Sequence, residues 1–287
     1  MGDGVISRTR VSTRAHETGD HRDPVALVVG SSSGIGKTMS EEFERLGYRV
    51  VRAARWTRTA IPPDRRQVLH VGFDASDPAA TLAAVNDIEA GFGPIEVLIC
   101  CAGDLRVSPV SETTWDDTQG VLRANLAPFV NGARAVLPHM IARRRGRIVA
   151  VGSGWSLMPT AGVPAYACAK AALAAYAGSL AAEAESHGVG VHVLFPGYVP
   201  STALAEQARL SGLREPIRLL WTRGRTLRKV AESLTRGRPP HVIYVNVMER
   251  FAPAVPSLSQ RLFWTACRTM QPFPSYLGEG RRGRWTA

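Results

Sequence analysis

The chain has 287 residues and a mass of 31.0 kDa, and 45% of its residues are apolar, so it can bury the core of one large domain. No apolar run approaches the roughly 20 residues that a membrane-spanning helix needs. The N-terminus lacks the apolar stretch of a secretion signal, and Ile6 stands where a myristoylation signal has Ser or Thr. We therefore expect a cytoplasmic protein. The spacing of the cysteines favours reduced thiols and predicts no metal site; they are Cys100, Cys101, Cys168 and Cys267.

The formal net charge of +11 comes mostly from the C-terminal part of the chain, because residues 206–287 hold 15 Arg or Lys against 5 Asp or Glu. Such a surface can attract nucleic acid, anionic lipid or an acidic ligand. We favour a solvated Arg-rich surface and expect no nucleic-acid partner. Residues 251–287 form a basic C-terminal extension whose apolar residues recur at helical spacing. We expect it to pack on its own domain or on a second subunit; contact with a membrane surface is the less favoured alternative.

The pattern along the chain predicts a doubly wound parallel α/β sheet, that is, a Rossmann fold. Residues 1–24 have almost no large apolar side chain, so we expect a disordered leader. Residues 25–250 then form one main domain in which short Val/Ile/Leu runs alternate with helical stretches, which indicates a sheet covered on both faces. The predicted strands are Val25–Gly30, Arg49–Ala54, Val68–Gly72, Val97–Cys101, Arg147–Gly152, Val189–Phe195 and His241–Asn246. The predicted helices between them are Gly34–Gly47, Pro78–Phe92, Arg123–Arg145 and Pro164–His187.

A glycine-rich turn follows the first predicted strand and opens the first helix. Glycines at such a turn allow the backbone to approach a pyrophosphate closely, and the helix start offers free N–H groups and the positive end of its dipole. The context of strand, loop and helix predicts a dinucleotide site, with the spacing GxxxGxG. The candidate residues are Gly30, Ser32, Ser33, Gly34, Ile35 and Gly36.

The end of the second strand indicates which dinucleotide is bound. In many nicotinamide-binding folds an acidic residue there binds the ribose 2′-hydroxyl, and an arginine accommodates the 2′-phosphate of NADP. Here Ala54 occupies the acidic position and Arg55 follows it, which favours NADP(H). The alternative is that Arg55 is one more surface arginine. Asp74, after the third strand, is a candidate partner for the adenine amino group, or else a helix cap.

Three polar residues have the spacing of an acid–base site. Tyr166 and Lys170 are four residues apart on one predicted helix, so both side chains lie on the same face, and Ser153 follows the preceding strand. A nearby cation lowers the pKa of a phenol and so suits it to general acid–base work. Tyr166 would protonate the alkoxide formed by hydride addition to a ketone, and Ser153 would orient that oxygen. The alternative is a core tyrosine and a solvated lysine.

Residues 25–202 closely resemble the short-chain dehydrogenase/reductase family, in its NADP(H)-preferring form. The loop Gly30–Gly36 is similar to the family motif TGxxxGIG, and Cys100 to Gly103 are similar to NNAG with both asparagines replaced, which retains Ala102 and Gly103. Asn125, Ser153, Tyr166 and Lys170 match the family's tetrad one by one. The resemblance implies that Lys170 also binds the nicotinamide ribose and that Asn125 holds a proton-relaying water.

The resemblance also implies cofactor contacts after the sixth strand. Pro196, Gly197 and Val199 are similar to the family's PGxV segment beside the nicotinamide, and Ser201 is the hydroxyl residue expected at the carboxamide, with Thr202 as the less favoured choice. Residues 203–235 occupy the place of the family's substrate lid. Its apolar residues favour a lipophilic carbonyl substrate, and its arginines leave an acidic or acyl-type substrate open.

The sequence therefore predicts an NADP(H)-dependent oxidoreductase that acts on a ketone or secondary alcohol and works as a homo-oligomer, either a dimer or a tetramer. One alternative is an epimerase or dehydratase that uses the same tetrad. Another is a non-catalytic dinucleotide sensor whose basic C-terminal region binds a partner. The intact pair of Tyr166 and Lys170 favours the enzyme, because a sensor needs no proton donor.

Overall fold

The computed structural model describes residues 24–55, 67–157, 161–212, 222, 224–237 and 239–245. Its framework is a seven-stranded parallel sheet in the order β3-β2-β1-β4-β5-β6-β7. The strands are β1 (Val25–Val29), β2 (Arg49–Ala54), β3 (Val68–Gly72), β4 (Ile95–Cys100), β5 (Gly146–Val151), β6 (Val189–Phe195) and β7 (Val242–Tyr244). This arrangement confirms the predicted doubly wound α/β fold.

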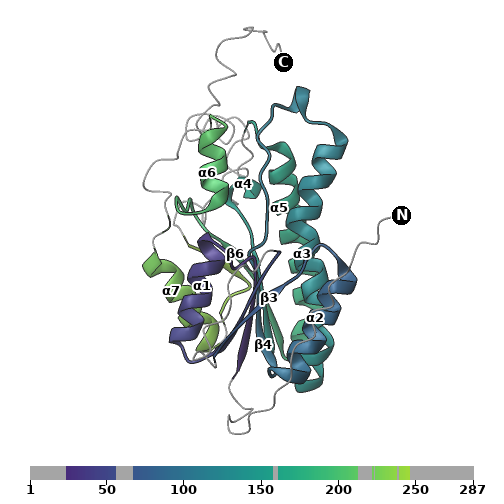
Figure 1. Ribbon diagram of the computed structural model, residues 1–287, viewed down its shortest axis with the longest axis vertical. Coiled ribbons are helices and arrows are strands. Elements are labelled where there is room, and N and C mark those ends of the chain that lie inside the picture. The colour runs from purple at the N-terminus through teal and green to yellow at the C-terminus, as the bar shows by residue number, and fades with distance from the viewer. Residues whose placement is uncertain are drawn as a thin grey trace, which may run out of the picture.

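Helices cover both faces of the sheet (Figure 1). The helices are α1 (Gly34–Arg45), α2 (Pro78–Gly91), α3 (Trp115–Arg143), α4 (Gly154–Leu157), α5 (Pro164–Ala184), α6 (Ala203–Leu210) and α7 (Gly224–Thr235), with 3-10 turns η1 (Val110–Glu112) and η2 (Glu185–His187). Helices α1 and α7 pack together on one face, and α2, α3 and α5 on the other. Among the described residues, no helix has the length and apolar character needed to cross a membrane.

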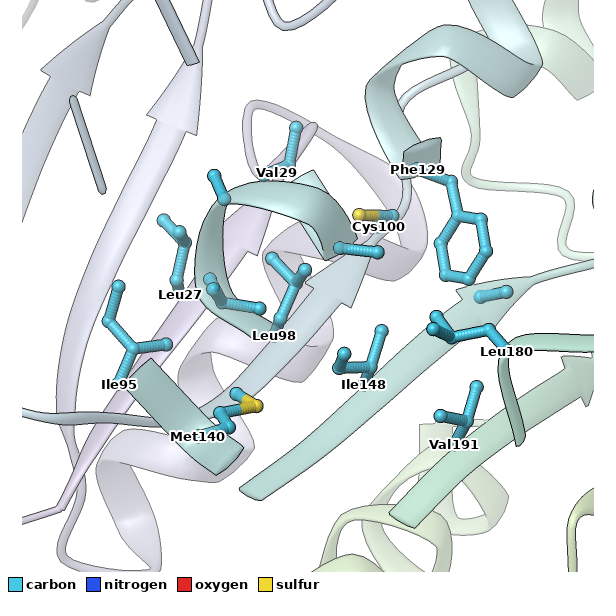
Figure 2. Packing of buried hydrophobic residues seen from close by; sticks show 14 of the residues in the cluster. Leu27, Val29, Ile95, Leu98, Cys100, Phe129, Met140, Ile148, Leu180 and Val191 are labelled. Atoms are coloured by element: carbon cyan, nitrogen blue, oxygen red, sulfur yellow. The ribbon is translucent and has the colours of Figure 1, made fainter. Parts of the chain in front are cut away.

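The strands read as continuous apolar runs because each of their faces packs against a helical layer. The larger core joins alternate strand residues such as Leu27, Leu98 and Ile148 to Phe129 of α3 and Leu180 of α5 (Figure 2). The smaller core uses the opposite side chains of the same strands against α1 and α7. Burying apolar surface on both faces stabilises the sheet at about 25 cal/mol per Å². Polar groups are thereby displaced to the ends of the strands.

The helix α3 begins at Trp115, eight residues before the predicted start at Arg123. Its first turns are polar, so they lack the apolar periodicity on which the prediction relied. They are stabilised instead by a capping box, in which the Thr114 hydroxyl accepts from the Asp117 N–H and the Asp117 carboxylate accepts from the Thr114 N–H. The sequence Thr-x-x-Asp was the available signal. The other predicted elements agree to within two residues, apart from the C-terminal turn of α5, which is the separate 3-10 turn η2, and the predicted end of the last strand at Asn246, which lies outside the described residues.

Only part of each predicted division of the chain lies among the residues that the structure describes, apart from the C-terminal extension, which lies wholly outside them. Apart from residue 24, the predicted leader lies outside the described residues, as does the whole C-terminal extension at 251–287. Helix α6 and helix α7 both fall within the segment 203–235 that we expect to act as a substrate lid. These domain boundaries remain predictions.

A buried histidine on β6 generates a prediction about acid stability. The ring of His192 is 5% exposed, and its Nδ1 lies 2.9 Å from the carbonyl oxygen of Pro240. Because a carbonyl only accepts, Nδ1 carries the proton, and Nε2 has no partner among the described residues. Burial lowers the pKa of His192. The hydrogen bond to the Pro240 carbonyl partly offsets this effect, and the nearby Arg147 and His241 lower the pKa further.

We expect the substitution His192→Gln to make the protein less sensitive to acid. The unfolded chain binds more protons than the folded chain below the ordinary histidine pKa, so the wild-type protein loses stability as the pH falls through that range. The free energy of unfolding, measured by chemical denaturation at pH 7.5 and 5.5, should therefore fall less in the variant. The exposed His187→Gln is the control. An equal fall in all three proteins would contradict this account of His192.

Candidate active site

A cavity of about 1580 Å³ runs along the carboxyl ends of the strands. The strand order reverses between β1 and β4, and ligands of open α/β sheets bind at such a switch point. The volume of the cavity exceeds the roughly 300–1000 Å³ of an ordinary small-molecule pocket, so a dinucleotide and a second molecule can both be accommodated. The cavity is lined by all six predicted residues of the glycine loop, by Arg55, Asp74, Ala102, Gly103, Ser153, Tyr166 and Lys170, and by Pro196, Gly197 and Val199.

The glycine loop is shaped by close backbone packing. Gly30 has a φ of 83°, and a Cβ placed there would lie 2.5 Å from the backbone nitrogen of Ala102. A Cβ on Gly36 would overlap the carbonyl oxygen of Gly30. Glycine at these two positions therefore allows α1 to start directly against the end of β1.

The N-terminus of α1 is available to an anion. The N-cap residue Ser33 makes no side-chain capping hydrogen bond, and the first turn of the helix contains no acidic residue. By contrast, side chains cap α2, α3 and α6: Asp77, Thr114 and Thr202 respectively. Free N–H groups at the positive end of a helix dipole bind phosphate well. This end of the cavity fits a pyrophosphate.

At the other side of β1, Arg55 and Asp74 lie where the sequence places an adenosine site. Arg55 is exposed and directly follows β2, and the Asp74 carboxylate accepts from the Ser76 N–H at 2.9 Å. That bond holds the pKa of Asp74 below its ordinary value, and the neighbouring Arg55 and Arg123 lower it further. Asp74 is therefore an ionised acceptor at neutral pH. Asp77, and not Asp74, caps the helix that follows.

The structure brings Ser153, Tyr166 and Lys170 together on the cavity wall. Tyr166 and Lys170 are 6% and 3% exposed, and Lys170 Nζ lies 5.6 Å from the centre of the Tyr166 ring. The Tyr166 hydroxyl is hydrogen-bonded to the Ser153 side chain. Lys170 Nζ donates to the carbonyl oxygen of Val151 at 3.0 Å. The end of β5 and the first turns of α5 thus hold all three groups in place.

The electrostatics of this group differ from the sequence-based expectation. Burial raises the pKa of Tyr166 to about 12, and the hydrogen bond with Ser153 only partly offsets that effect. The sequence analysis expects Lys170 to lower the pKa of Tyr166. For the protein without a bound cofactor this expectation was wrong, because burial disfavours the phenolate more than a cation facing the ring stabilises it. Burial also lowers the pKa of Lys170 to about 8. At neutral pH the site therefore holds a neutral phenol beside an ammonium group.

Asn125 lies behind this wall and does not line the cavity. It is 1% exposed, and its Nδ2 donates to the carbonyl oxygens of Asp104 and Val121. Its Oδ1 has no hydrogen-bond partner among the described residues. Gly103 lies between this oxygen and Lys170: a Cβ on Gly103 would be 2.5 Å from Asn125 Oδ1 and 3.5 Å from Lys170 Nζ. The arrangement leaves an acceptor beside the lysine.

The segment after β6 approaches the cavity through Thr202 and not through Ser201. Ser201 is exposed and is absent from the cavity wall, whereas Thr202 lines it. The Thr202 hydroxyl donates to the Val199 carbonyl and accepts from the Ala205 N–H, so it caps α6. A carboxamide contact from Ser201 remains a prediction.

The two cysteines that replace asparagines have different surroundings. Cys100 points into the larger core (Figure 2), and Cys101 lines the cavity. Burial raises the pKa of both thiols, that of Cys101 to about 12. They are therefore protonated at neutral pH. The Cys101 N–H still donates to the Val29 carbonyl at 2.8 Å, so the backbone path is kept.

The sequence analysis missed the apolar walls beside Tyr166. Trp155 packs edge-on against the Tyr166 ring, with 5.8 Å between the ring centres. Leu105 and Val121 are buried in the same small cluster, and Leu204 packs against it. These side chains come from four separate segments, so no local pattern connects them. Trp155, two residues after Ser153, was the one available signal.

These features define a Rossmann-fold protein with a dinucleotide cleft that ends at a Ser, Tyr and Lys group. A family model described as short chain dehydrogenase matches residues 24–211. The chain belongs to the short-chain dehydrogenase/reductase family, whose members are oxidoreductases that use nicotinamide cofactors, act on small molecules and commonly oligomerise.

Known relatives agree with this assignment. The chain is 30% identical over 181 residues to the 3-oxoacyl-(acyl-carrier-protein) reductase of Salmonella typhimurium. The aligned segment covers 61% of this chain and 73% of the reductase. It is 28% identical over 277 residues to dehydrogenase/reductase SDR family member 7B of Rattus norvegicus, covering 91% and 85%.

Solved structures show the same fold. A short-chain dehydrogenase from Streptomyces avermitilis superposes with a TM-score of 0.71 at 22% identity, covering 86% of this chain and 97% of that one. A gluconate 5-dehydrogenase from Burkholderia cenocepacia, solved with NADP and tartrate, gives a TM-score of 0.65 at 26% identity and covers 78% and 94%.

The buried ammonium group generates a prediction about stability. The difference between the ordinary lysine pKa of 10.5 and the value of about 8 for Lys170 corresponds to about 3 kcal/mol of destabilisation at pH 7. Lys170→Met removes that cost but loses the hydrogen bond from the ammonium group to Val151, worth about 1.5–3 kcal/mol because the donor is charged. We expect the variant to gain up to about 1.5 kcal/mol in free energy of unfolding at pH 7, measured by chemical denaturation without added cofactor.

The pH dependence separates this effect from a change in packing. Because the unfolded chain binds more protons than the folded chain between pH 8 and 10.5, wild-type stability should rise over that range relative to Lys170→Met. The exposed Lys37→Met serves as the control. A constant difference between Lys170→Met and wild type at every pH would contradict the electrostatic cause.

Proposed function

We propose that this protein transfers hydride between NADP(H) and the carbon of a ketone or secondary alcohol, with Tyr166 as the general acid and base. One observation carries the proposal. The Ser153 and Tyr166 hydroxyls and the Lys170 ammonium group meet on the wall of the same cavity that the glycine loop opens. A proton donor and a dinucleotide cleft in one cavity suit an enzyme better than a sensor.

The residues of the cleft fit a nicotinamide dinucleotide along its whole length. The uncapped N-terminus of α1 would bind the pyrophosphate. Gly30, Gly34 and Gly36 have no side chains, so they would allow the pyrophosphate to approach the backbone closely. Arg55 would bind the 2′-phosphate and Asp74 the adenine amino group. Ala102, Gly103, Pro196, Gly197 and Val199 would enclose the nicotinamide end. The bound cofactor would supply or accept the hydride.

The protein's own groups would handle the proton. A phenol with a pKa of about 12 is protonated at neutral pH, so Tyr166 is ready to donate to a forming alkoxide. Ser153 would hydrogen-bond the same oxygen and hold it in place. Lys170 would stabilise the phenolate left after proton transfer. Asn125 Oδ1, the free acceptor beside Lys170, would support the path by which the proton is replaced.

The surroundings of Tyr166 favour a lipophilic or acyl-type substrate. Leu105, Val107, Trp155, Leu204 and Ala208 line the cavity around the phenol. An apolar wall with a few convergent polar groups is typical of small-molecule sites. The relative from Salmonella typhimurium is a reductase of 3-oxoacyl groups on a carrier protein, which supports a keto substrate on an acyl chain.

The protein is also proposed to form a homo-oligomer, because members of the family commonly do so.

The preference for NADPH is tested by titrating the purified protein with NADPH and NADH and following its tryptophan fluorescence. Wild-type protein should bind NADPH at least about tenfold more tightly, because a charge-assisted hydrogen bond to phosphate is worth about 1.5–3 kcal/mol. Arg55→Ala should lose most of that preference and keep its affinity for NADH. Equal binding of the two cofactors by wild type would overturn the proposed role of Arg55.

The role of Tyr166 is tested by the substitution Tyr166→Phe. We expect turnover of NADPH with a panel of aliphatic ketones, followed by the absorbance of the reduced nicotinamide, to fall by at least about 100-fold, as general acid catalysis contributes 10²–10⁴-fold. Cofactor affinity should change little. Tyr176→Phe, on the same helix but outside the cavity wall, is the matched control. Unchanged turnover in Tyr166→Phe would refute the proposed chemistry.

A further inference from the structure

A second arginine, Arg123 of α3, reaches the adenosine end of the cavity. It is exposed and lines the cavity together with Arg55 and Asp74. Its Nε lies 3.4 Å from the hydroxyl of Ser76, the residue whose N–H binds the Asp74 carboxylate. The end of β2, the loop after β3 and the third turn of α3 therefore converge on one carboxylate.

The charges at this point do not balance. Both Arg55 and Arg123 act on Asp74, so two cations face one anion. Other arginines of the fold have carboxylate partners: Arg106 pairs with Asp117 at 3.0 Å, and Arg143 with Glu89 at 2.7 Å. In the part of the chain that the structure describes, neither Arg55 nor Arg123 forms an ion pair within 4.0 Å. Of these three interacting groups, two are therefore positive and one is negative.

A surplus cation opposite an arginine fits an anion of more than one charge. A phosphate monoester carries about −1.5 to −2 at neutral pH and is bound well by arginines on two sides. Asp74 alone would repel such a group, and Arg55 by itself only balances Asp74. With Arg123, the group formed by Arg55, Arg123 and Asp74 has a net positive charge.

We infer that Arg123 is a second specificity residue for the 2′-phosphate of NADP(H), acting from α3 opposite Arg55. The inference rests on the proposed function, since it assumes that the cavity binds this cofactor. It assigns a role to a residue that lies outside the glycine loop and outside the end of β2. The preference for NADP(H) is thereby shared between a residue at the end of β2 and a residue of α3.

The test compares five proteins: wild type, Arg123→Ala, Arg123→Lys, the double variant Arg55→Ala/Arg123→Ala and the control Arg134→Ala. Arg134 is an exposed arginine further along α3 and away from the cavity wall. The probes are adenosine 2′,5′-bisphosphate and adenosine 5′-monophosphate, titrated by calorimetry, together with NADPH and NADH. The two members of each pair, bisphosphate and monophosphate or NADPH and NADH, differ only in the 2′-phosphate. A folding defect would weaken both members of each pair.

Arg123→Ala should weaken binding of the bisphosphate and of NADPH about two- to fivefold, the range for an exposed charge pair, and leave adenosine 5′-monophosphate and NADH unchanged. Arg123→Lys should keep most of the preference, and raising the salt concentration should reduce it. The double variant Arg55→Ala/Arg123→Ala should show no preference. Arg134→Ala should match wild type.

The outcomes separate this inference from the proposed function. A wild-type protein that prefers NADPH while Arg123→Ala keeps the full preference would overturn the role of Arg123 alone. An equal loss for both members of each pair, in a variant whose thermal unfolding matches that of wild type, would do the same, because it would make Arg123 a general adenine contact. A wild-type protein that binds neither cofactor would overturn the proposed function itself.

Discussion

The burial of the parallel sheet on both faces is the constraint on which the rest of the molecule depends. β1 is apolar along its whole length and β4 from Val97 onward, so neither face has room for polar chemistry there. Parallel strands all end at one edge, and the chain crosses the helical layers between them. Polar residues therefore gather beyond the carboxyl ends, where the strand order reverses and the cavity lies. The same core that stabilises the fold determines where its chemistry can occur.

The acid–base group costs stability at this edge. Placing Lys170 and Tyr166 among apolar side chains disfavours both of their charged forms, which moves the pKa of the lysine down to about 8 and that of the tyrosine up to about 12. The result at neutral pH is a protonated phenol beside a cation, poised to donate. Such destabilised polar groups are typical of functional sites, where stability is exchanged for pre-organised chemistry.

The cofactor end solves a different electrostatic problem. The first turn of α1 carries no acidic residue and no capping side chain, so its N–H groups remain available. Around Asp74, by contrast, a charge at the end of β2 and a charge from α3 act on one carboxylate. The N–H groups and the helix dipole at the start of α1 would bind the pyrophosphate, which NAD(H) and NADP(H) share, so they cannot discriminate between the two cofactors. Side-chain charge at the rim is what can distinguish a 2′-phosphate from a hydroxyl.

Several parts of this description could be predicted from local patterns. The apolar strands, the glycine loop and the four-residue spacing of Tyr166 and Lys170 are short-range features, and each has a direct physical meaning in the chain itself. The start of α3 at Trp115 was not predicted, because a polar first turn stabilised by a capping box has no apolar period. The pKa of Tyr166 could not be read from spacing either, since it depends on how much of the fold covers the phenol.

By itself, the sequence determined the class of fold, the place of the glycine loop and the residues of the proposed acid–base group, because these depend on neighbours within a few positions. Only the tertiary structure decided that Trp155, Leu105 and Leu204 form one apolar wall, that Thr202 and not Ser201 lines the cavity, and that Arg123 shares Asp74 with Arg55. Those residues come from separate segments of the chain. Their proximity is a product of how the helices pack on the sheet, and no local pattern encodes it.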